Sequence, residues 1–428
     1  MQYRVDAASG LRWTPPSGNH QLHEPPVKVV FLCQRVPYPP DRGDRITTWH
    51  ILQHCLLLGA EVRVGCFAEE ARDAEALHFL RERCQAVEAP MLRRTPWQKL
   101  LSLRGLLTGQ ALTLPFFRHR ALQATVDHWL QNDPPDLIFV YSSSMAQYVL
   151  DRRGAKKVMH FAELDSDKWR QFAARSGPIG KWLYGREART LLAFEAEVAR
   201  DFDRSLVVSD VEQGLFIKQI PGVVPDVLPN GVDVEHFCSA GDARREPHTL
   251  VFTGVMDYEP NVDGVCWFAD NCWLALREQF PDAKLLIVGS KPLPAVQALA
   301  QRPGIEVTGR VATTPPFFDR ATIAIAPLRL ARGVQNKVLE ALSMGLPVVA
   351  TPQAAQGLGE VPMGVLRIAR TPQATIAHIT ELWRDPARAR SDGQAAASFV
   401  RAHWRWQNTY ARLDALFAQL GVSPTIRH

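Results

Sequence analysis

Short apolar runs alternate with amphipathic stretches along nearly the whole chain, and each run has the length of a buried strand. In the first half the runs lie at 27–33, 60–67, 135–142, 156–161 and 204–209. In the second half they lie at 248–254, 283–290, 305–309, 321–328, 346–351 and 364–369. The stretches between them carry helical periodicity. Strand and helix patterns that alternate in this way predict an α/β protein with parallel sheets covered by helices on both faces.

The number of these runs is large for one open sheet, so the pattern predicts two doubly wound domains that face each other across a cleft. We expect a polar tail at 1–26, a first domain at 27–225, a second domain at 226–400 and a closing helix at 401–428 that packs across both domains. Asn230-Gly231 lies at the boundary. An Asn-Gly pair is typical of a hairpin turn, but its place between two α/β halves favours a connector at the cleft.

The composition narrows the class of protein. A chain of 428 residues with 46% hydrophobic residues can build a large core. No apolar window is long enough to span a membrane, and the N-terminus lacks the apolar core of a secretory signal. Seven cysteines are scattered without a C-x-x-C pair, which indicates reduced thiols in a cytoplasmic protein. No spacing predicts a metal site.

The net charge of +5 does not by itself indicate nucleic acid as a partner. One segment, 89–126, lacks acidic residues and carries apolar residues such as Trp97 and Phe116. This pattern favours contact with an anionic membrane surface, and an ordinary pair of surface helices is the alternative. The basic residues of the segment are Arg93, Arg94, Lys99, Arg104, Arg118 and Arg120.

The stretch 332–345, RGVQNKVLEALSMG, has the periodicity of a helix with an apolar stripe. Lys337 and Glu340 nevertheless share one narrow face of this helix. The backbone amides of Gly333, Val334 and Gln335 would hold an anion at the helix N-terminus. Lys337 would add a charge that suits a phosphate, and Glu340 could accept two hydroxyl hydrogen bonds from a ribose. This order matches a nucleoside diphosphate along the helix, whereas the alternative is an exposed Lys–Glu pair.

Two common nucleotide motifs are missing from the chain. Neither the glycine-rich dinucleotide fingerprint nor the P-loop occurs, so oxidoreductase and P-loop NTPase functions lose their main support.

Three motifs in order, PNGVD at 229–233, FTGVMDYEPNVDGVCWF at 252–268 and RGVQNKVLEALSMGLPVVAT at 332–351, resemble the family-four glycosyltransferases of the GT-B fold. More narrowly, the chain resembles the sugar transferases associated with exopolysaccharide and PEP-CTERM gene clusters, over about residues 27–410. The resemblance implies a retaining, metal-independent hexosyltransferase. The first domain would bind a lipid-linked or glycan acceptor and the second a nucleoside-diphosphate sugar, on the cytoplasmic face of the plasma membrane.

The resemblance also assigns residues, with two departures from the family pattern. Glu340 corresponds to the family glutamate expected on the ribose. Arg332 stands where the family usually has a second glutamate that touches the donor sugar. The basic residue that often follows the first donor-domain strand is missing from 255–261. We therefore expect Lys337, with Arg329 or Arg332, to hold the diphosphate.

Further donor-side residues follow from the same resemblance. Gly254 would let the substrate approach the backbone, or would serve only as a turn glycine. Asn261 is expected to cap the next helix, with a ligand role as the alternative. Arg310 and Val311 correspond to the loop that contacts the base through backbone groups.

On the acceptor side, Gly43, Asp44 and Arg45 correspond to the family's first cleft loop. Asp165 is the candidate carboxylate for orienting an acceptor hydroxyl, so the predicted catalytic residues are Lys337, Glu340 and Asp165. The D-S-D at 165–167 resembles the metal signature of another glycosyltransferase fold, but its place in the first domain favours a cleft loop. His160 is predicted to be a core histidine.

Two other functions stay open at this point. A sugar-nucleotide epimerase of the same fold class would convert its substrate without an acceptor. A non-catalytic scaffold of a polysaccharide export machine, suggested by the basic segment and the missing glutamate, would bind no nucleotide.

Overall fold

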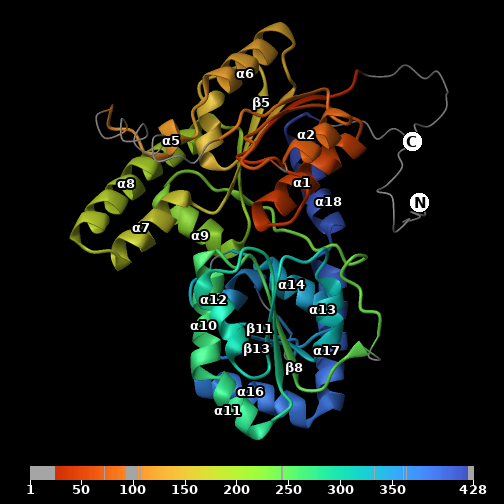
Figure 1. Cartoon of the computed structure of the whole chain (residues 1–428). Helices are drawn as coiled ribbons and strands as arrows, with labels where there is room; N and C mark the ends of the chain where they lie inside the picture. The colour runs from red at the N-terminus through yellow and green to blue at the C-terminus, as the bar shows by residue number, and fades with distance from the viewer. Residues whose placement is uncertain are drawn as a thin grey trace, which may run out of the picture.

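The computed structural model describes residues 25–71, 73–92, 105, 108–241, 244–331, 333–359, 361–362 and 364–422. It contains two parallel sheets that follow each other along the chain, as Figure 1 shows. This architecture confirms the predicted α/β fold.

The first sheet has seven strands in the order β3-β2-β1-β4-β5-β6-β7. The order reverses between β1 and β4, and such a switch point opens a crevice at the carboxyl ends of the strands. The strands are β1 (Lys28–Leu32), β2 (Glu61–Gly65), β3 (Ala86–Glu88), β4 (Leu137–Tyr141), β5 (Lys156–Ala162), β6 (Arg204–Val207) and β7 (Asp226–Val227). The helices are α1 (Gly43–Leu57), α2 (Asp73–Arg81), α5 (Thr113–Phe116), α6 (Arg120–Asn132), η1 (Ser143–Tyr148), α7 (Asp165–Arg175), α8 (Pro178–Asp201) and α9 (Asp210–Gln219).

The second sheet has six strands in the order β10-β9-β8-β11-β12-β13, with its own reversal between β8 and β11. The strands are β8 (Thr249–Thr253), β9 (Lys284–Val288), β10 (Ile305–Gly309), β11 (Ile323–Ala326), β12 (Val348–Ala350) and β13 (Leu366–Ile368). The helices are α10 (Glu259–Asn271), α11 (Trp273–Gln279), α12 (Pro294–Ala298), η3 (Leu299–Gln301), α13 (Pro315–Arg320), α14 (Asn336–Ser343), α15 (Pro352–Ala355), η4 (Gln356–Leu358) and α16 (Pro372–Arg384).

The central strands are buried on both faces, as their continuous apolar sequences predict. All five residues of β4 are buried, and so are all five of β8. The first sheet has a separate apolar core on each face, and the second domain has a core of its own.

Two strands, β3 and β7, are missing from the sequence-based prediction. They have three and two residues and lie at the two edges of the first sheet. An edge strand is only partly buried, so it lacks the continuous apolar run that marks a central strand. The Asn230-Gly231 pair follows β7 in the connector between the sheets and joins no hairpin, because all described strand pairs near it are parallel.

The predicted closing helix is interrupted between α17 (Pro386–His403) and α18 (Trp406–Gln419). The connector between the two sheets contacts the C-terminal segment at this break, where the Val232 N–H donates to the Trp404 carbonyl at 2.7 Å. A Cβ on Gly231 would lie 2.6 Å from the backbone of Trp406, so only glycine allows this close crossing.

The two helices pack against different domains. Helix α17 packs against α14 in the second domain, and α18 returns to α1 in the first (Figure 1). His50 and His54 of α1 contact Tyr410 and Asp414 of α18 at 2.8 and 2.6 Å. The expectation that the C-terminal end packs across both domains is therefore confirmed.

Candidate functional site

Lys337 lies at the centre of the candidate site in the second domain. Helix α14 begins at Asn336 and not at 332, where the predicted helical stretch starts, so Lys337 lies in its first turn. Its Nζ donates a hydrogen bond to Asn261 Oδ1 and lies 4.6 Å from the centroid of the Phe252 ring. The apolar stripe of α14 is buried and holds the helix in place. The ammonium group is therefore fixed beside the carboxyl end of β8.

Gly254 provides the space for this ammonium group. A Cβ at position 254 would lie 3.0 Å from Lys337 Nζ and 2.6 Å from Asn261 Nδ2. Side chains therefore approach the backbone closely at Gly254, whereas the predicted approach of a substrate stays a prediction.

The capping role predicted for Asn261 is wrong. Tyr258 is the N-cap residue of α10, and Asn261 lies in the first turn with its side chain buried. Its Nδ2 donates to the Val255 carbonyl at 2.9 Å, and its Oδ1 accepts from Lys337. The amide therefore ties the loop after β8 to α14 and orients Lys337.

The pKa values of Lys337 and Glu340 are both displaced toward neutrality. Burial lowers the pKa of Lys337 to about 7, although the charge of Glu340 opposes this shift. Burial raises the pKa of Glu340 to about 7, and Lys337 opposes that shift in turn. Both side chains keep part of their surface exposed, so a ligand can reach them. An anion bound here would favour the charged lysine.

The loop before α14 holds the other predicted donor-side residues. Gly333 has a left-handed backbone, with φ +60°, and a Cβ on it would lie 3.2 Å from Val208 of the first domain. Val334 is partly buried, and Gln335 is the N-cap residue of α14. Arg329 forms an ion pair with Asp263 on α10, with Nε 2.9 Å from Oδ2. Arg332 lies outside the described residues.

Two ion pairs join the loops of the two domains. Arg310 follows β10 and its Nη2 lies 3.4 Å from Asp41 Oδ2 in the loop before α1. Lys291, after β9, lies 2.8 Å from Glu70, after β2. These loops extend from the carboxyl ends of parallel strands, so the pairs connect the edges where α/β sheets bind ligands. Val311, beside Arg310, is partly buried.

The predicted acceptor-side loop is only partly exposed. Gly43 is the exposed first residue of α1. Burial alone would raise the pKa of Asp44, but Arg35 and Arg42 hold that pKa below its usual value. Arg45 is buried and its Nη2 lies 3.0 Å from Asp73 Oδ1. Arg45 therefore belongs to an ion pair inside the first domain, and Gly43 is the residue of this loop most open to a ligand.

Asp165 is the first residue of α7, at the carboxyl end of β5. The hydroxyls of Ser142 and Ser143 each lie 3.5 Å from its Oδ2. Burial raises the pKa of Asp165, and Lys168 opposes this shift. The aspartate and the two serines form a polar cluster at the carboxyl ends of β4 and β5.

Glu195 is a buried carboxylate behind this cluster that the sequence reasoning missed. It accepts a hydrogen bond from Ser166 N–H at 3.3 Å, and its Oε2 has no partner within the described part of the chain. Burial and the nearby charge of Asp165 raise the pKa of Glu195 to about 8. A signal existed in the sequence, because Glu195 falls on the same helical face as Leu191 and Val198.

The two aspartates of the D-S-D at 165–167 have different partners in the structure. Asp167 is buried and accepts hydrogen bonds from Arg170 and Gln171 of its own helix. Across the described residues, no group of three or more His, Cys, Asp or Glu could hold a metal ion. His160 is buried, its Nδ1 accepts from Ala162 N–H at 3.0 Å, and burial lowers its pKa to about 3. His160 is thus the core histidine that the sequence predicted.

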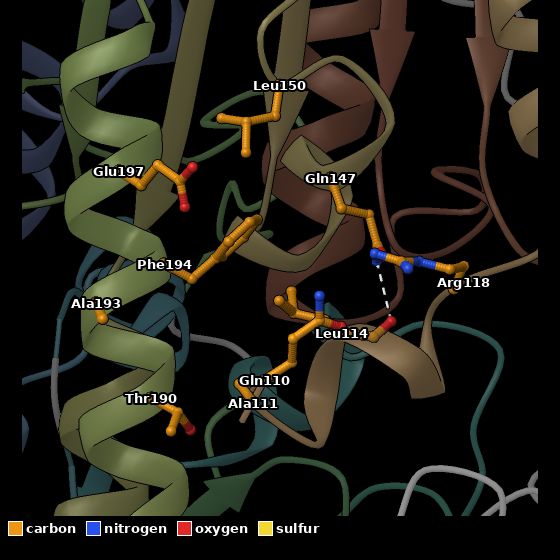
Figure 2. Close-up of a pocket in the computed structure, with 10 residues that line it drawn as sticks. All are labelled: Gln110, Ala111, Leu114, Arg118, Gln147, Leu150, Thr190, Ala193, Phe194 and Glu197. Carbon is orange, nitrogen blue, oxygen red and sulfur yellow. Dashed lines mark hydrogen bonds between the residues drawn. The ribbon is translucent and has the colours of Figure 1, made fainter. Parts of the chain in front are cut away.

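A cavity of about 340 Å³ lies apart from these residues, between α5, η1 and α8 of the first domain (Figure 2). Gln147 is one of the residues that line the cavity. Its Nε2 donates to the Leu114 carbonyl at 3.1 Å, and its Oε1 accepts from Arg118 Nε at 3.0 Å. Phe194 forms part of the wall, and Glu197 lines the same cavity from α8. The lining of this cavity combines apolar side chains with a carboxylate and an arginine.

Within the part of the chain that the structure describes, no helix has both the length and the apolar character needed to cross a membrane.

Comparison with known proteins finds a family model that matches part of the second domain. Residues 247–385 match the model of the glycosyl transferases group 1. An uncharacterized 44.6 kDa protein of Klebsiella pneumoniae, from a cps region, is 20% identical over 402 residues, which cover 90% of this chain and 98% of that protein.

The fold of the whole chain is also found among solved structures. Sucrose-phosphate synthase from Thermosynechococcus elongatus superposes with a TM-score of 0.70 at 17% identity, over 92% of this chain and 99% of that one. HepE of Anabaena, solved in complex with UDP-glucose, superposes with a TM-score of 0.60 at 15% identity, over 92% and 100% of the two chains. The protein is therefore a glycosyltransferase with the GT-B fold, and residues 247–385 of its second domain are similar to the glycosyl transferases of group 1.

Proposed function

We propose that this protein transfers a hexose from a nucleoside-diphosphate sugar to a hydroxyl of a lipid-linked or glycan acceptor, with retention, in exopolysaccharide or capsule assembly. The observation that carries this proposal is the fixed ammonium group of Lys337 in the first turn of α14, inside the region similar to group 1. A helix N-terminus and a lysine together suit a diphosphate.

The donor occupies the second domain in this proposal. Lys337 faces the diphosphate, the backbone of Gly333, Val334 and Gln335 supports it, and Glu340 accepts hydrogen bonds from the ribose. Asn261 acts through Lys337 as a positioning residue. HepE was solved with UDP-glucose, so uridine-linked hexoses are the first donors to test.

The acceptor occupies the first domain, with Asp165 as the group that orients its hydroxyl. In this proposal no side chain acts as nucleophile, and the departing phosphate oxygen takes the acceptor proton on the same face of the sugar. The protein then contributes orientation of the two substrates and stabilisation of the negative charge that grows on the leaving diphosphate. The glycosidic bond to phosphate breaks as the bond to the acceptor oxygen forms.

The role in polysaccharide assembly has its own support. The name of the Klebsiella pneumoniae relative places that protein in a cps region, and the chain's motifs resemble sugar transferases of exopolysaccharide and PEP-CTERM gene clusters. Both observations favour an acceptor that is a growing glycan or its lipid carrier.

A panel of nucleotide sugars tests the proposal. A specific donor should raise the melting temperature by mass action, and release of nucleoside diphosphate should require an acceptor. Conversion of the nucleotide sugar without an acceptor would instead identify an epimerase. The absence of any shift across the panel would favour the scaffold function.

Chelation of metal ions with EDTA is expected to leave transferase activity largely intact. The donor charge is balanced by Lys337 and the backbone of α14 in this proposal, so no step depends on a cation. Initial rates with EDTA and with added magnesium or manganese provide the measurement. Activity that disappears with EDTA and returns with metal would reassign the diphosphate to a bound cation.

Donor affinity is expected to fall as the pH rises above about 7. In the empty site Lys337 loses its proton near pH 7, and the bound diphosphate favours the charged form, so binding takes up a proton. Deprotonation of Glu340 in the same range favours the hydrogen bonds that its carboxylate accepts from the ribose, so it offsets part of this loss. The dissociation constant should rise by up to about tenfold per pH unit.

Calorimetric titration checks this pH dependence. The ligand should be an intact nucleotide sugar, because the terminal phosphate of a free nucleoside diphosphate titrates near neutral pH itself. Lys337→Gln should bind more weakly and lose most of the slope. The same slope in both proteins would assign the proton uptake to another group.

A further inference from the structure

The hairpin formed by α7 and α8 projects from the first domain (Figure 1). From residue 168 to residue 186 it contains no acidic residue. Its basic residues are Lys168, Arg170, Arg175, Lys181 and Arg186. The turn between the helices and the first turns of α8 are therefore uniformly positive.

The tip of this hairpin also exposes large apolar side chains. Ile179 is 84% exposed and Trp182 is 61% exposed. They lie three residues apart in the first turns of α8, so they share one side of the helix. An exposed tryptophan beside an exposed isoleucine, ringed by basic residues, is a combination that marks an interaction surface.

Aromatic packing fixes the hairpin below its tip. Trp169 and Phe172 of α7 lie 5.5 and 6.2 Å from Tyr184 of α8, measured between ring centroids. At the base of the hairpin, the carboxylate of Glu187 accepts hydrogen bonds from the backbone N–H groups of Leu112 and Thr113 at 2.6 and 2.9 Å. The exposed residues are thus presented by a braced structure.

The segment 89–126, predicted from sequence to contact a membrane, differs from this hairpin. In its described part most of the apolar side chains are buried in the core of the first domain, although Met91 is exposed. Examples are Leu114, Phe117, Leu122 and Val126. Residues 93–104 lie outside the described residues, so the prediction for them stays a prediction. The hairpin, in contrast, combines exposed apolar and basic side chains.

We propose that the tip of the α7–α8 hairpin, residues 175–182, docks on an anionic lipid bilayer. Ile179 and Trp182 would enter the interface between headgroups and acyl chains, while Arg175 and Lys181 contact lipid phosphates. A second copy of this chain is the poorer occupant, because a two-fold contact would bring two positive tips together.

The hairpin also connects this surface to the acceptor side of the enzyme. Helix α7 begins at Asp165 and has 11 residues, so its length is about 16 Å. Docking at the tip would hold Asp165 within reach of a glycan attached to a lipid headgroup. This step alone rests on the proposed function, whereas binding to the bilayer does not.

Co-sedimentation with vesicles tests the docking surface. The full chain should bind vesicles of phosphatidylcholine with phosphatidylglycerol, and bind phosphatidylcholine alone much less. Replacing Ile179 and Trp182 together by serine should weaken binding by about tenfold to a hundredfold. Replacing Arg175 and Lys181 together by glutamine should weaken it by about thirtyfold at low salt and by less at high salt.

A matched control uses Leu274→Ser, because Leu274 is 71% exposed on α11 in the second domain. This variant should bind vesicles as the wild type does. All variants should keep the wild-type melting temperature, since the altered side chains are exposed. Binding by the two tip variants equal to that of the wild type would overturn the proposal.

Two further readouts separate the possible outcomes. Light scattering in solution should show the same mass for the wild type and the tip variants, and a lower mass for the variants would show an interface between copies and overturn bilayer docking. Turnover on a soluble acceptor should stay unchanged in the tip variants. Loss of vesicle binding with intact soluble turnover supports the proposal, whereas a wild type that lacks transferase activity but binds vesicles would refute only the proposed function.

Discussion

Lys337→Ala is expected to lower kcat between about thirtyfold and a thousandfold, with little change in melting temperature. The ammonium group contacts a diphosphate whose charge grows as the glycosidic bond breaks, so its removal costs about 2–4 kcal/mol of transition-state stabilisation. The fold should tolerate the change. The burial that lowers the pKa of Lys337 also means that the charged side chain lowers the free energy of unfolding, and alanine removes that cost. Steady-state kinetics and a thermal melt measure the two effects.

Lys284→Ala provides the matched control for this experiment. Lys284 is the exposed first residue of β9, at the amino end of the strand and so at the opposite edge of the sheet from the site. Its removal should leave kcat near the wild-type value. Lys337→Ala with activity within about threefold of the wild type would exclude Lys337 as the phosphate contact, given the loss expected for such a group.

Gly289→Ala is expected to destabilise the second domain by about 2–4 kcal/mol. A Cβ at position 289 would lie 1.7 Å from the Gly254 carbonyl oxygen, and a backbone atom cannot move aside as a flexible side chain can. The ends of β8 and β9 would have to separate, which displaces the loop that positions Lys337. Thermal and denaturant unfolding should show the loss, and donor affinity should fall with it.

Gly214→Ala is the control for this glycine. Gly214 lies within α9, and a Cβ there would have no atom within 4 Å. Alanine in a helix interior should be neutral or slightly stabilising. Equal stability of Gly289→Ala and the wild type would show that the two strand ends do not need to approach so closely.

The alternation of apolar runs and amphipathic stretches was enough to predict the two parallel sheets. A central strand of a parallel sheet is buried on both faces, so its sequence is a continuous run of apolar residues. Residues 137–141, LIFVY, and 249–253, TLVFT, follow this rule and form β4 and β8. The short edge strands β3 and β7 do not follow it, because half of their surface needs no apolar cover.

Lys337 and Glu340 could also be identified from sequence, since two charged residues on one face of an otherwise apolar helix form a local pattern. The partner of Lys337 could not be identified, because Asn261 lies 76 positions away and meets it only when β8 and α14 pack together. The partner of Arg45 could not be identified either. Arg45 was predicted to lie on the acceptor side, and in the structure it forms a buried ion pair with Asp73.

The break between α17 and α18 shows the same limit. Residues 386–419 carry continuous helical periodicity, and nothing local in them marks an end at Trp404. The helix stops there because the interdomain connector crosses at Gly231 and Val232, and Val232 binds the Trp404 carbonyl. Periodicity records which face of each element is buried, and so the sequence by itself determined the elements, the two sheets and the charged face of α14. Contacts between segments distant in sequence leave no such periodic trace, so the orientation of Lys337, the pairing of Arg45 and the crossing of the domains were decided only by the tertiary structure.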